Sequence, residues 1–393
     1  MTPIVIPVRD RKTMRDFLRL PFDVYRGDPD WVAPISSEVR KTLDVRQNPY
    51  FTSSELKLFV CYDENGPAAR VAIVINPLHR QRFGVNAAFF GFFESKNDTE
   101  VVRHLFEAAE SYCRSRGVES LEGPFNPNHY SELGLQANKF DSPPSFFQAH
   151  NPPYYLELLQ EVGFRETVKF HTRKNEHIKE YMAQRLQKWE GTLVIPGYTT
   201  RHFSMKNIKS DLERVREVFN DAFSSNWNFL PLSREEYSFT AEFLHLVTLP
   251  ELVVIVEHEG VPVGVLECVL DINPLLRQFR GTVGPIKFLR FLRKRKKIRN
   301  LIIYAVGIKK AYQGTHVFAL LLDAACRMAR NFDVMETTWM SDDNKLVLRA
   351  AKLLGLGRDK EFVIYGKTLG SQFRTFSSGV SRYKEPAVTG GLS

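Results

Sequence analysis

Two stretches of the chain alternate between apolar and polar positions in the way that is typical of a β-hairpin. Residues 56–76 read LKLFVCYDENGPAARVAIVIN, and residues 252–273 read LVVIVEHEGVPVGVLECVLDIN. Each has two runs rich in β-branched and aromatic residues, separated by a short polar turn that carries Gly66 or Gly260. The sequence therefore predicts one hairpin in each half of the chain.

The elements predicted after the two hairpins follow one order: strand, helix, strand, helix. Asp98, Asn151 and Asn344 stand where helix N-caps are expected. Such a recurring order indicates an internal repeat of two similar units. The predicted ranges are 87–93, 98–116, 118–123 and 154–162 in the first half, and 300–308, 317–330, 334–340 and 344–354 in the second. Before the second hairpin, apolar spacing predicts a strand over 199–204 and helices over 208–223 and 233–247.

Length and composition agree with two globular units. The chain has 393 residues, of which 43% are hydrophobic and 25% are charged, and this excludes a mainly disordered or collagen-like chain. We predict a first domain over 1–185 and a second over 186–370, which carries a basic insertion at 285–299. Residues 371–393 are rich in Ser, Gly and Thr and are predicted to form a mobile tail.

The order of elements in the second half, strand, two helices, hairpin, strand, helix, strand, helix, strand, resembles the N-acetyltransferase superfamily related to the general control acetyltransferases (GNAT). The resemblance implies an α/β fold of two tandem GNAT-like domains, each a mixed, mostly antiparallel sheet flanked by helices. It also implies an acyl-CoA co-substrate, with no permanently bound cofactor.

In this superfamily a loop of the form Gln/Arg-x-x-Gly-x-Gly/Ala binds the pyrophosphate of coenzyme A through backbone N–H groups at the start of a helix. Here Gln313 fits, but His316 and Phe318 fill the two small positions, and Ala351 replaces the Tyr that often serves as general acid. The resemblance implies acyl-CoA contacts from Gln313, Gly314, Thr315, His316, Val317 and Asn344. The alternative is a strand-to-helix turn that binds nothing.

The first half lacks this loop. Residues 94–98, Glu-Ser-Lys-Asn-Asp, take its place, and their acids are expected to repel a pyrophosphate. We therefore expect the first half to be a copy that does not bind the coenzyme, or one that binds the acceptor.

A long segment of the first half, GPFNPNHYSELGLQANKFDSPPSFFQAHNPPYY at 123–155, follows a predicted strand. Long ordered loops more often carry a site than merely connect elements. The segment is similar to the most characteristic stretch of a group of bacterial tandem acetyltransferase-like proteins, which the second half also resembles around Asn226-Trp227-x-Phe229. The resulting candidates for substrate contact are Asn126, Asn128, Asp141, Tyr154, Tyr155 and Trp227.

An amine acceptor requires a base that removes its proton and a route for a proton to the departing thiolate. Glu132 or His129 is a candidate base, and Tyr130 is a candidate donor. Glu336 lies on the predicted strand 334–340, where GNAT-like folds often place acceptor contacts. Each has a structural alternative: a turn carboxylate for Glu132, a hydrogen-bonding loop residue for His129, and a solvated strand residue for Glu336.

The insertion before the strand at 300–308 is strongly basic. Residues 287–299 contain eight cations and no acid, and they hold all but one of the nine excess positive charges of the chain. Wound as a helix, the insertion places Phe288, Leu289 and Leu292 on one face, with Phe291 at its edge. A solvated helix with a core-facing stripe and docking on an anionic membrane are equally weighted interpretations. Nucleic-acid binding is the least favoured, because the chain lacks a recognised nucleic-acid motif.

The spacing of the cysteines and the lengths of the apolar runs argue against a disulfide-rich, metal-binding or membrane-spanning protein. The 4 Cys form no Cys-x-x-Cys pattern, so neither a disulfide framework nor a metal site is expected. The sequence shows no signal-like or membrane-spanning run, which favours a cytoplasmic protein, with peripheral docking on the inner face of the membrane as an option.

The leading hypothesis is an acyl-CoA-dependent N-acyltransferase whose second half binds the donor and whose first half helps to build the acceptor site. Its sharpest form is amide formation between a long-chain acyl-CoA and a sphingoid amine, giving ceramide. Two alternatives remain: a non-catalytic GNAT-like protein that binds a lipid or a partner, and a transferase that uses aminoacyl-tRNA.

Overall fold

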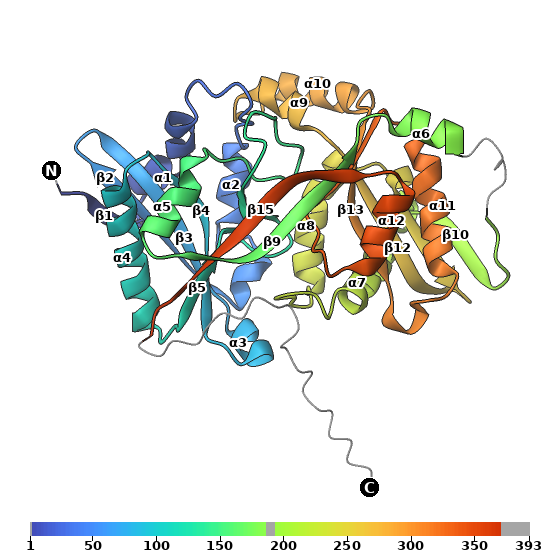
Figure 1. Cartoon of the computed structure of the whole chain (residues 1–393), viewed down its shortest axis with the longest axis horizontal. Helices are drawn as coiled ribbons and strands as arrows, with labels where there is room; N and C mark the ends of the chain where they lie inside the picture. Colours follow the sequence, from blue (N-terminus) through green and yellow to red (C-terminus); the bar gives the residue numbers. More distant parts are fainter. Residues whose placement is uncertain (1, 186–192, 371–393) are drawn as a thin grey trace, which may run out of the picture.

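The computed structural model describes residues 2–185 and 193–370 and shows one continuous sheet at the centre of the molecule, with helices packed on both faces (Figure 1). The sheet has 13 strands, twelve of them in the order β1-β2-β3-β4-β5-β15-β9-β14-β13-β12-β11-β10, with β8 paired to β15 off this path. Most pairs are antiparallel, whereas β4 with β5 and β13 with β14 are parallel. This mixed α/β architecture confirms the predicted fold class.

The first half supplies one end of the sheet. Its strands are β1 (Ile4–Pro7), β2 (Glu55–Asp63), β3 (Gly66–Ile75), β4 (Ala87–Ser95), β5 (Ser120–Gly123) and β9 (Arg165–Asn175). Its helices are α1 (Arg11–Val24), α2 (Ser36–Thr42), α3 (Pro77–Phe83), α4 (Thr99–Ser115), α5 (Tyr154–Glu161) and α6 (Ile178–Arg185). Three short strands lie in the long loop: β6 (Phe125–Asn126), β7 (Glu132–Leu133) and β8 (Leu135–Gln136).

The second half repeats this plan at the other end. Its strands are β10 (Tyr198–His202), β11 (Val253–His258), β12 (Val261–Leu270), β13 (Asn300–Ile308), β14 (Val334–Thr337) and β15 (Gly357–Thr368). Its helices are α7 (Ile208–Ala222), α8 (Arg234–Val247), α9 (Asn273–Leu276), α10 (Pro285–Arg295), α11 (Val317–Ala329) and α12 (Lys345–Leu353). Both predicted hairpins are confirmed as β2–β3 and β11–β12.

The two halves exchange their last strands. β15, from the end of the second half, pairs with β5 of the first half, and β9, from the first half, pairs with β14 of the second. β9 and β15 also pair with each other, with Phe170 opposite Phe362, and run side by side across the middle of the molecule (Figure 1). The exchange joins two GNAT-like sheets into one.

Local sequence signals explain several helix boundaries. The side chain of Asp98 accepts hydrogen bonds from the N–H groups of Glu100 and Val101 and caps α4, as predicted. Asn344 likewise caps α12 through Val347. The prediction for Asn151 was wrong, because its side chain bonds the backbone of Gln136 and α5 begins after Pro153. The predicted tail over 371–393 lies outside the described residues.

Candidate active site

A cavity of about 380 Å³ lies between the two halves. The first half contributes the long loop, Arg70 from the middle of β3, the end of β4, and α2 with the segment before it, and the second half contributes α8 and α9. The acceptor cavity, as we call it, is lined largely by apolar and aromatic side chains. They include Tyr25, Trp31, Val32, Ile35, Phe93, Phe146, Phe147, Phe239, Leu244 and Leu276.

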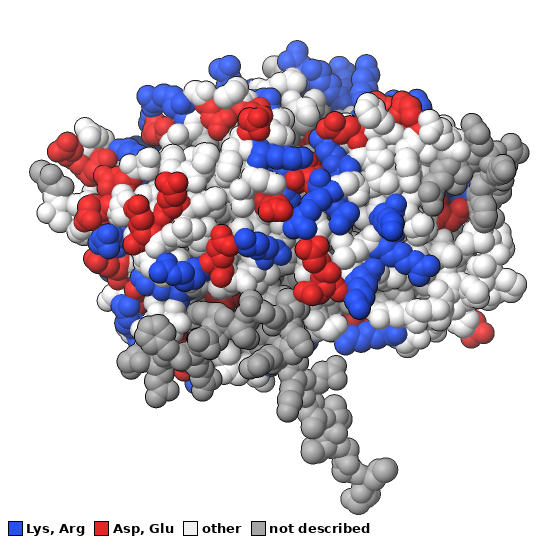
Figure 2. Space-filling view, viewed as in Figure 1, with Lys and Arg blue, Asp and Glu red and all other residues white. Residues whose placement is uncertain are grey.

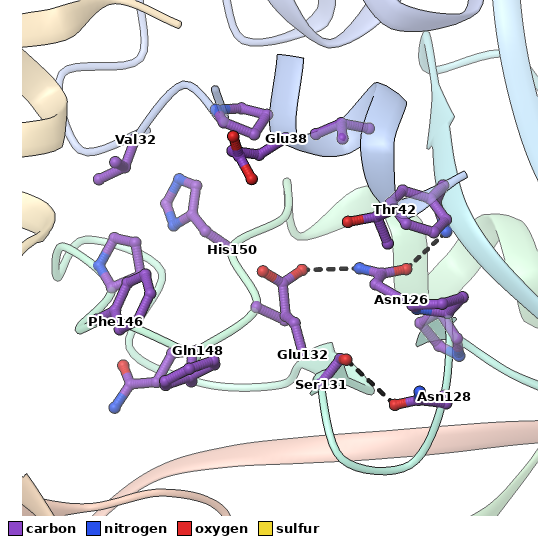
Figure 3. Close-up of a pocket in the computed structure, with 18 of the residues that line it drawn as sticks. Val32, Glu38, Thr42, Asn126, Asn128, Ser131, Glu132, Phe146, Gln148 and His150 are labelled. Atoms are coloured by element: carbon purple, nitrogen blue, oxygen red, sulfur yellow. Dashed lines mark hydrogen bonds between the residues drawn. The ribbon is translucent and has the colours of Figure 1, made fainter. Parts of the chain in front are cut away.

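Glu132 points into the acceptor cavity, into the same space as Glu38 and His150 (Figure 3). Asn126 Nδ2 donates to Glu132 Oε1 at 2.9 Å, and Asn126 Oδ1 in turn accepts from the N–H of Phe92 on β4 at 2.6 Å. Asn126 therefore fixes the carboxyl group against the sheet. Burial, together with the nearby charge of Glu94, raises the pKa of Glu132 to about 7.

A second buried carboxyl group, that of Glu94, lines the same cavity. Tyr155 donates its hydroxyl hydrogen to Glu94 Oε2 at 2.9 Å, and Arg70 Nη2 lies 3.5 Å from Glu94 Oε1. Arg70 is itself held by a 2.7 Å hydrogen bond from Nη1 to the carbonyl of Phe17. Burial raises the pKa of Glu94, and the positive charge of Arg70 opposes that rise. The cavity thus holds two coupled carboxyl groups beside one cation.

Sequence reasoning missed this network. It placed Glu94 in an acidic loop, but Glu94 lies inside β4, opposite Arg70 in the β3–β4 register. The available signal was Arg70 itself, a lone charge within the apolar run AARVAIVI, because charged residues are almost never fully buried without a partner.

A second cavity, of about 610 Å³, is lined mainly by the second half, with residues 129–131, Phe147, Val168 and Phe170 from the first. We call it the donor cavity, after the role that we propose for it. β13 and β14 pair only from Asn300 to Ile303 of β13, after which β13 continues to Ile308 beyond the end of β14. The space beyond the paired segment is lined from β13 by Tyr304, Ala305 and Val306, and from the opposite side by residues 337–341. Gln313 and Asn344, two predicted coenzyme contacts, also line the donor cavity.

The side chains of the loop before α11 do not fill the donor cavity. Gly314 adopts a left-handed conformation with φ of 81°, and no atom lies within 4 Å of where a Cβ would stand. Thr315 and His316 are exposed, and His316 makes no capping hydrogen bond at the start of α11. Phe318 lies beneath the guanidinium of Arg349, 5.7 Å from its ring centre, and does not line the donor cavity. Val317 is buried against Gly264. The two departures from the family pattern therefore do not block the site.

The two cavities adjoin, and four residues line both: Tyr130, Ser131, Phe147 and Tyr304. Tyr130 donates its hydroxyl hydrogen to the carbonyl of Leu230 and accepts from the N–H of the same residue at 3.0 Å. Its hydroxyl is thus engaged on both sides. Tyr304 stands at an irregularity in the β12–β13 pairing and donates its hydroxyl hydrogen to the Tyr130 carbonyl at a longer distance of 3.3 Å. Burial raises the pKa of Tyr304, which keeps its proton at neutral pH.

His129 and Trp227 both line the donor cavity. His129 is buried among Phe89, Phe125 and Trp227, and burial lowers its pKa to about 3. An imidazole with so low a pKa is a weak base, so Glu132 is the better candidate. Asn128 lines the acceptor cavity and bonds the N–H of Tyr130 at 3.1 Å, which shapes the turn before Glu132.

Glu336 is buried but lines neither of these two cavities. Its carboxyl group accepts hydrogen bonds from Ser145 Oγ at 2.6 Å and from Gln148 Nε2. Burial raises the pKa of Glu336 to about 7. Glu336 therefore anchors the loop that carries Phe146 and Phe147 into the acceptor cavity.

Two predicted substrate contacts lie outside both cavities. Asp141 is exposed, and Tyr154 donates to the carbonyl of Ser95 at 2.9 Å. Tyr155, by contrast, lines the acceptor cavity beside Glu94. The geometry thus gives no support for a substrate contact by Asp141 or Tyr154.

At the place in the first half that matches the donor cavity, the chain lies directly against the sheet. Phe125 and Asn126 pack directly on Gly91 of β4, where a Cβ would collide with the carbonyl oxygen of Phe125. The gap that lines the donor cavity in the second half is therefore occupied here by the chain itself.

The described part of the chain offers neither a metal site nor a membrane-spanning helix. No group of three or more His, Cys, Asp or Glu side chains there is arranged to hold a metal ion. No helix within residues 2–185 and 193–370 is long and apolar enough to cross a lipid bilayer.

Comparison with known proteins identifies similar chains. No protein-family model matches. The chain is 27% identical over 377 residues to a bacterial ceramide synthase of Caulobacter vibrioides, covering 93% of this chain and 97% of that protein. It is 24% identical over 368 residues to protein YghO of Escherichia coli, covering 92% and 94%. Among solved structures, a tandem GNAT protein from the clavulanic acid biosynthesis pathway matches 94% of this chain and 100% of its own, with a TM-score of 0.55 and 13% identity. The structural match confirms the predicted tandem GNAT-like fold.

Proposed function

We propose that this protein transfers an acyl group from acyl-CoA to an amine, with the thioester held in the donor cavity and the amine in the acceptor cavity. The observation that carries the proposal is that the two cavities adjoin. They have four lining residues in common, with Glu132 lining one cavity and Gln313 and Asn344 lining the other. The backbone N–H groups at the start of α11 suit the pyrophosphate of the donor.

The reaction requires a balanced transfer of protons. The amine nitrogen attacks the thioester carbonyl carbon, the new C–N bond replaces the C–S bond, and coenzyme A leaves as a thiolate. Glu132, with a pKa of about 7, takes the proton that the nitrogen loses. Tyr304 is better placed than Tyr130 to protonate the thiolate, because its hydroxyl is held by one long hydrogen bond. Tyr304 then regains a proton from solvent and Glu132 releases its proton to solvent, which returns both groups to their starting states.

The proposed substrates are a long-chain acyl-CoA and a sphingoid amine. The aromatic and aliphatic lining of the acceptor cavity suits an alkyl chain. The name of the Caulobacter vibrioides relative, a bacterial ceramide synthase, points to the same pair of substrates.

The test measures thiol release and the N-acyl product by mass spectrometry, with acetyl-CoA or palmitoyl-CoA as donor and sphinganine or 3-ketosphinganine as acceptor. We expect product with palmitoyl-CoA. Glu132→Gln should lower kcat by about 10²–10⁴-fold, the usual contribution of a well-placed base. The matched control is Glu107→Gln, which removes an exposed carboxyl group of α4 and should leave kcat unchanged.

Three outcomes would contradict the proposal or part of it. No thiol release with any acyl-CoA, together with no thermal shift by coenzyme A, would favour a non-catalytic lipid- or partner-binding protein. Transfer that depends on aminoacyl-tRNA would show that the donor is a charged tRNA and not acyl-CoA. Product with acetyl-CoA alone would keep the enzyme class and reject the long acyl chain.

A further inference from the structure

Helix α10 presents apolar side chains in two directions. Phe291 is buried and faces Phe279 at a ring-centre distance of 6.2 Å, and Leu292 packs against the core of the second half. Ile286 and Leu289, in contrast, are 83% and 59% exposed, and Phe288 is 37% exposed. The core-facing stripe is therefore Phe291 and Leu292. Of the face predicted from the sequence, Phe288, Leu289 and Leu292, only Leu292 packs against the core.

The exposed apolar residues of α10, Ile286, Phe288 and Leu289, are surrounded by positive charge. Arg290, Arg293, Lys294, Lys296, Lys297 and Arg299 are exposed, and none of them pairs with a carboxylate among the described residues. In Figure 2, Lys and Arg side chains gather along the top edge of the molecule, where Figure 1 shows α10. The first three of these cations lie on α10, and the other three lie between α10 and β13. Exposed aliphatic side chains beside such cations are typical of an interfacial helix.

The helix is rigidly connected to the acceptor cavity. Asn273 and Leu276 of α9, which precedes α10, line that cavity. The intervening turn is fixed to the first half, because the N–H of Ser36 donates to the carbonyl of Gly281 at 3.1 Å, and Gly281 packs on Phe22 and Pro34. Lys287 also closes this turn by donating to the carbonyl of Phe279 at 2.8 Å.

We propose that α10 is a docking surface for an anionic lipid bilayer, with Ile286 and Leu289 inserted among the headgroups and the six exposed cations against lipid phosphates. The positive charge of this surface is complementary to an anionic bilayer. A nucleic acid is also anionic, but its backbone offers no apolar partner for the exposed aliphatic side chains, so the bilayer is the favoured partner. Docking does not depend on the proposed transferase activity. It would bring the acceptor cavity next to the membrane.

The experiment is flotation of the full chain with vesicles that contain phosphatidylglycerol, against vesicles of pure phosphatidylcholine. One variant combines Arg290→Gln, Arg293→Gln and Lys297→Gln, and we expect it to bind anionic vesicles about a hundredfold more weakly. A second combines Ile286→Ser and Leu289→Ser, with an expected loss of about tenfold or more. The matched control combines Arg11→Gln, Lys12→Gln and Arg19→Gln, which removes three exposed cations of α1 and should lose little.

Three results would overturn the proposal. They are flotation that is equal on both vesicle types, flotation that the two α10 variants do not change, or a loss in the α1 control as large as that in the charge variant. Salt-sensitive binding of tRNA that the charge variant abolishes, without flotation of the unmodified protein, would assign α10 to nucleic acid. Circular dichroism of each variant confirms that the fold is retained, and thiol release measured in detergent reports the transferase activity separately.

Discussion

The carboxyl group of Glu132 is tuned by its surroundings to the pH at which a base must work. Burial and the charge of Glu94 raise its pKa to about 7, so it is half ionised near neutrality. Only the ionised form accepts a proton, and kcat/KM for transfer should therefore fall about tenfold per pH unit below 7 and level off above it. In Glu132→Gln this inflection should disappear. An inflection that persists would assign it to another group, such as Glu94.

A substitution at Gln313, which lines the donor cavity, tests whether the coenzyme binds there. Gln313→Glu places a negative charge at the mouth of the donor cavity, where the pyrophosphate is proposed to lie, and should raise KM for acyl-CoA about tenfold or more through like-charge repulsion. Neither kcat nor KM for the amine should change much. Gln278→Glu, on the segment between α9 and α10, is the matched control and should leave KM for acyl-CoA unchanged. An unchanged KM in Gln313→Glu would place the coenzyme elsewhere.

Single residues also show how far the sequence could predict the site. The segment 123–155 was recognisable because its polar residues stand among glycines, prolines and aromatics, and it does supply Glu132, Asn126 and Asn128 to the acceptor cavity. Arg70 and Glu94 were not recognisable as a pair, because they meet only through the register of β3 and β4. The neutral state of His129 likewise depends on burial among rings from separate elements.

At the scale of elements, the contact between β4 and β6 distinguishes the first half from the second, because β6 fills the space that matches the donor cavity. A Cβ on Gly91 would collide with the backbone of Phe125, so glycine at this position allows the loop to fill the gap. We expect Gly91→Ala to lower the free energy of unfolding by about 3 kcal/mol and to reduce activity, because Asn126 positions Glu132. Gly357→Ala, whose nearest contact would be 3.9 Å away, is the control, with an expected change within about 0.5 kcal/mol in urea unfolding. Equal stability of the two variants would contradict this packing.

The predicted elements were accurate where pattern and cap agreed, as in α4 and in both hairpins. The long closing strands β9 and β15 were not assigned ranges, because each carries charged residues on its less buried positions and neither is bounded by a hairpin turn. Their exchange could not be predicted from local pattern at all. Strand pairing between residues about 200 positions apart is a property of the whole sheet, as in Gly366 opposite Arg165.

At the scale of the whole molecule, the exchange makes the two halves depend on each other. Residues Ile178 and Met182 of α6 are fully buried in the core of the second half, although they precede the predicted domain boundary at 185. β15, from the second half, covers β5 of the first half, with Tyr365 opposite Gly123. Each half thus completes its sheet with a strand of the other, and the acceptor cavity is lined from both.

This arrangement predicts the behaviour of a cut chain. A site-specific protease site placed between residues 185 and 193 should yield two pieces that stay together on size-exclusion chromatography, unfold in one transition and keep transferase activity. The piece 2–185 expressed alone should aggregate or lack a cooperative transition, because without β15 the edges of β5 and β9 are unpaired. A chain cut after residue 370 is the control for cleavage itself. Two pieces that separate in native buffer and each unfold cooperatively would show that the halves are independent domains, and the exchanged strands would then contribute little to stability.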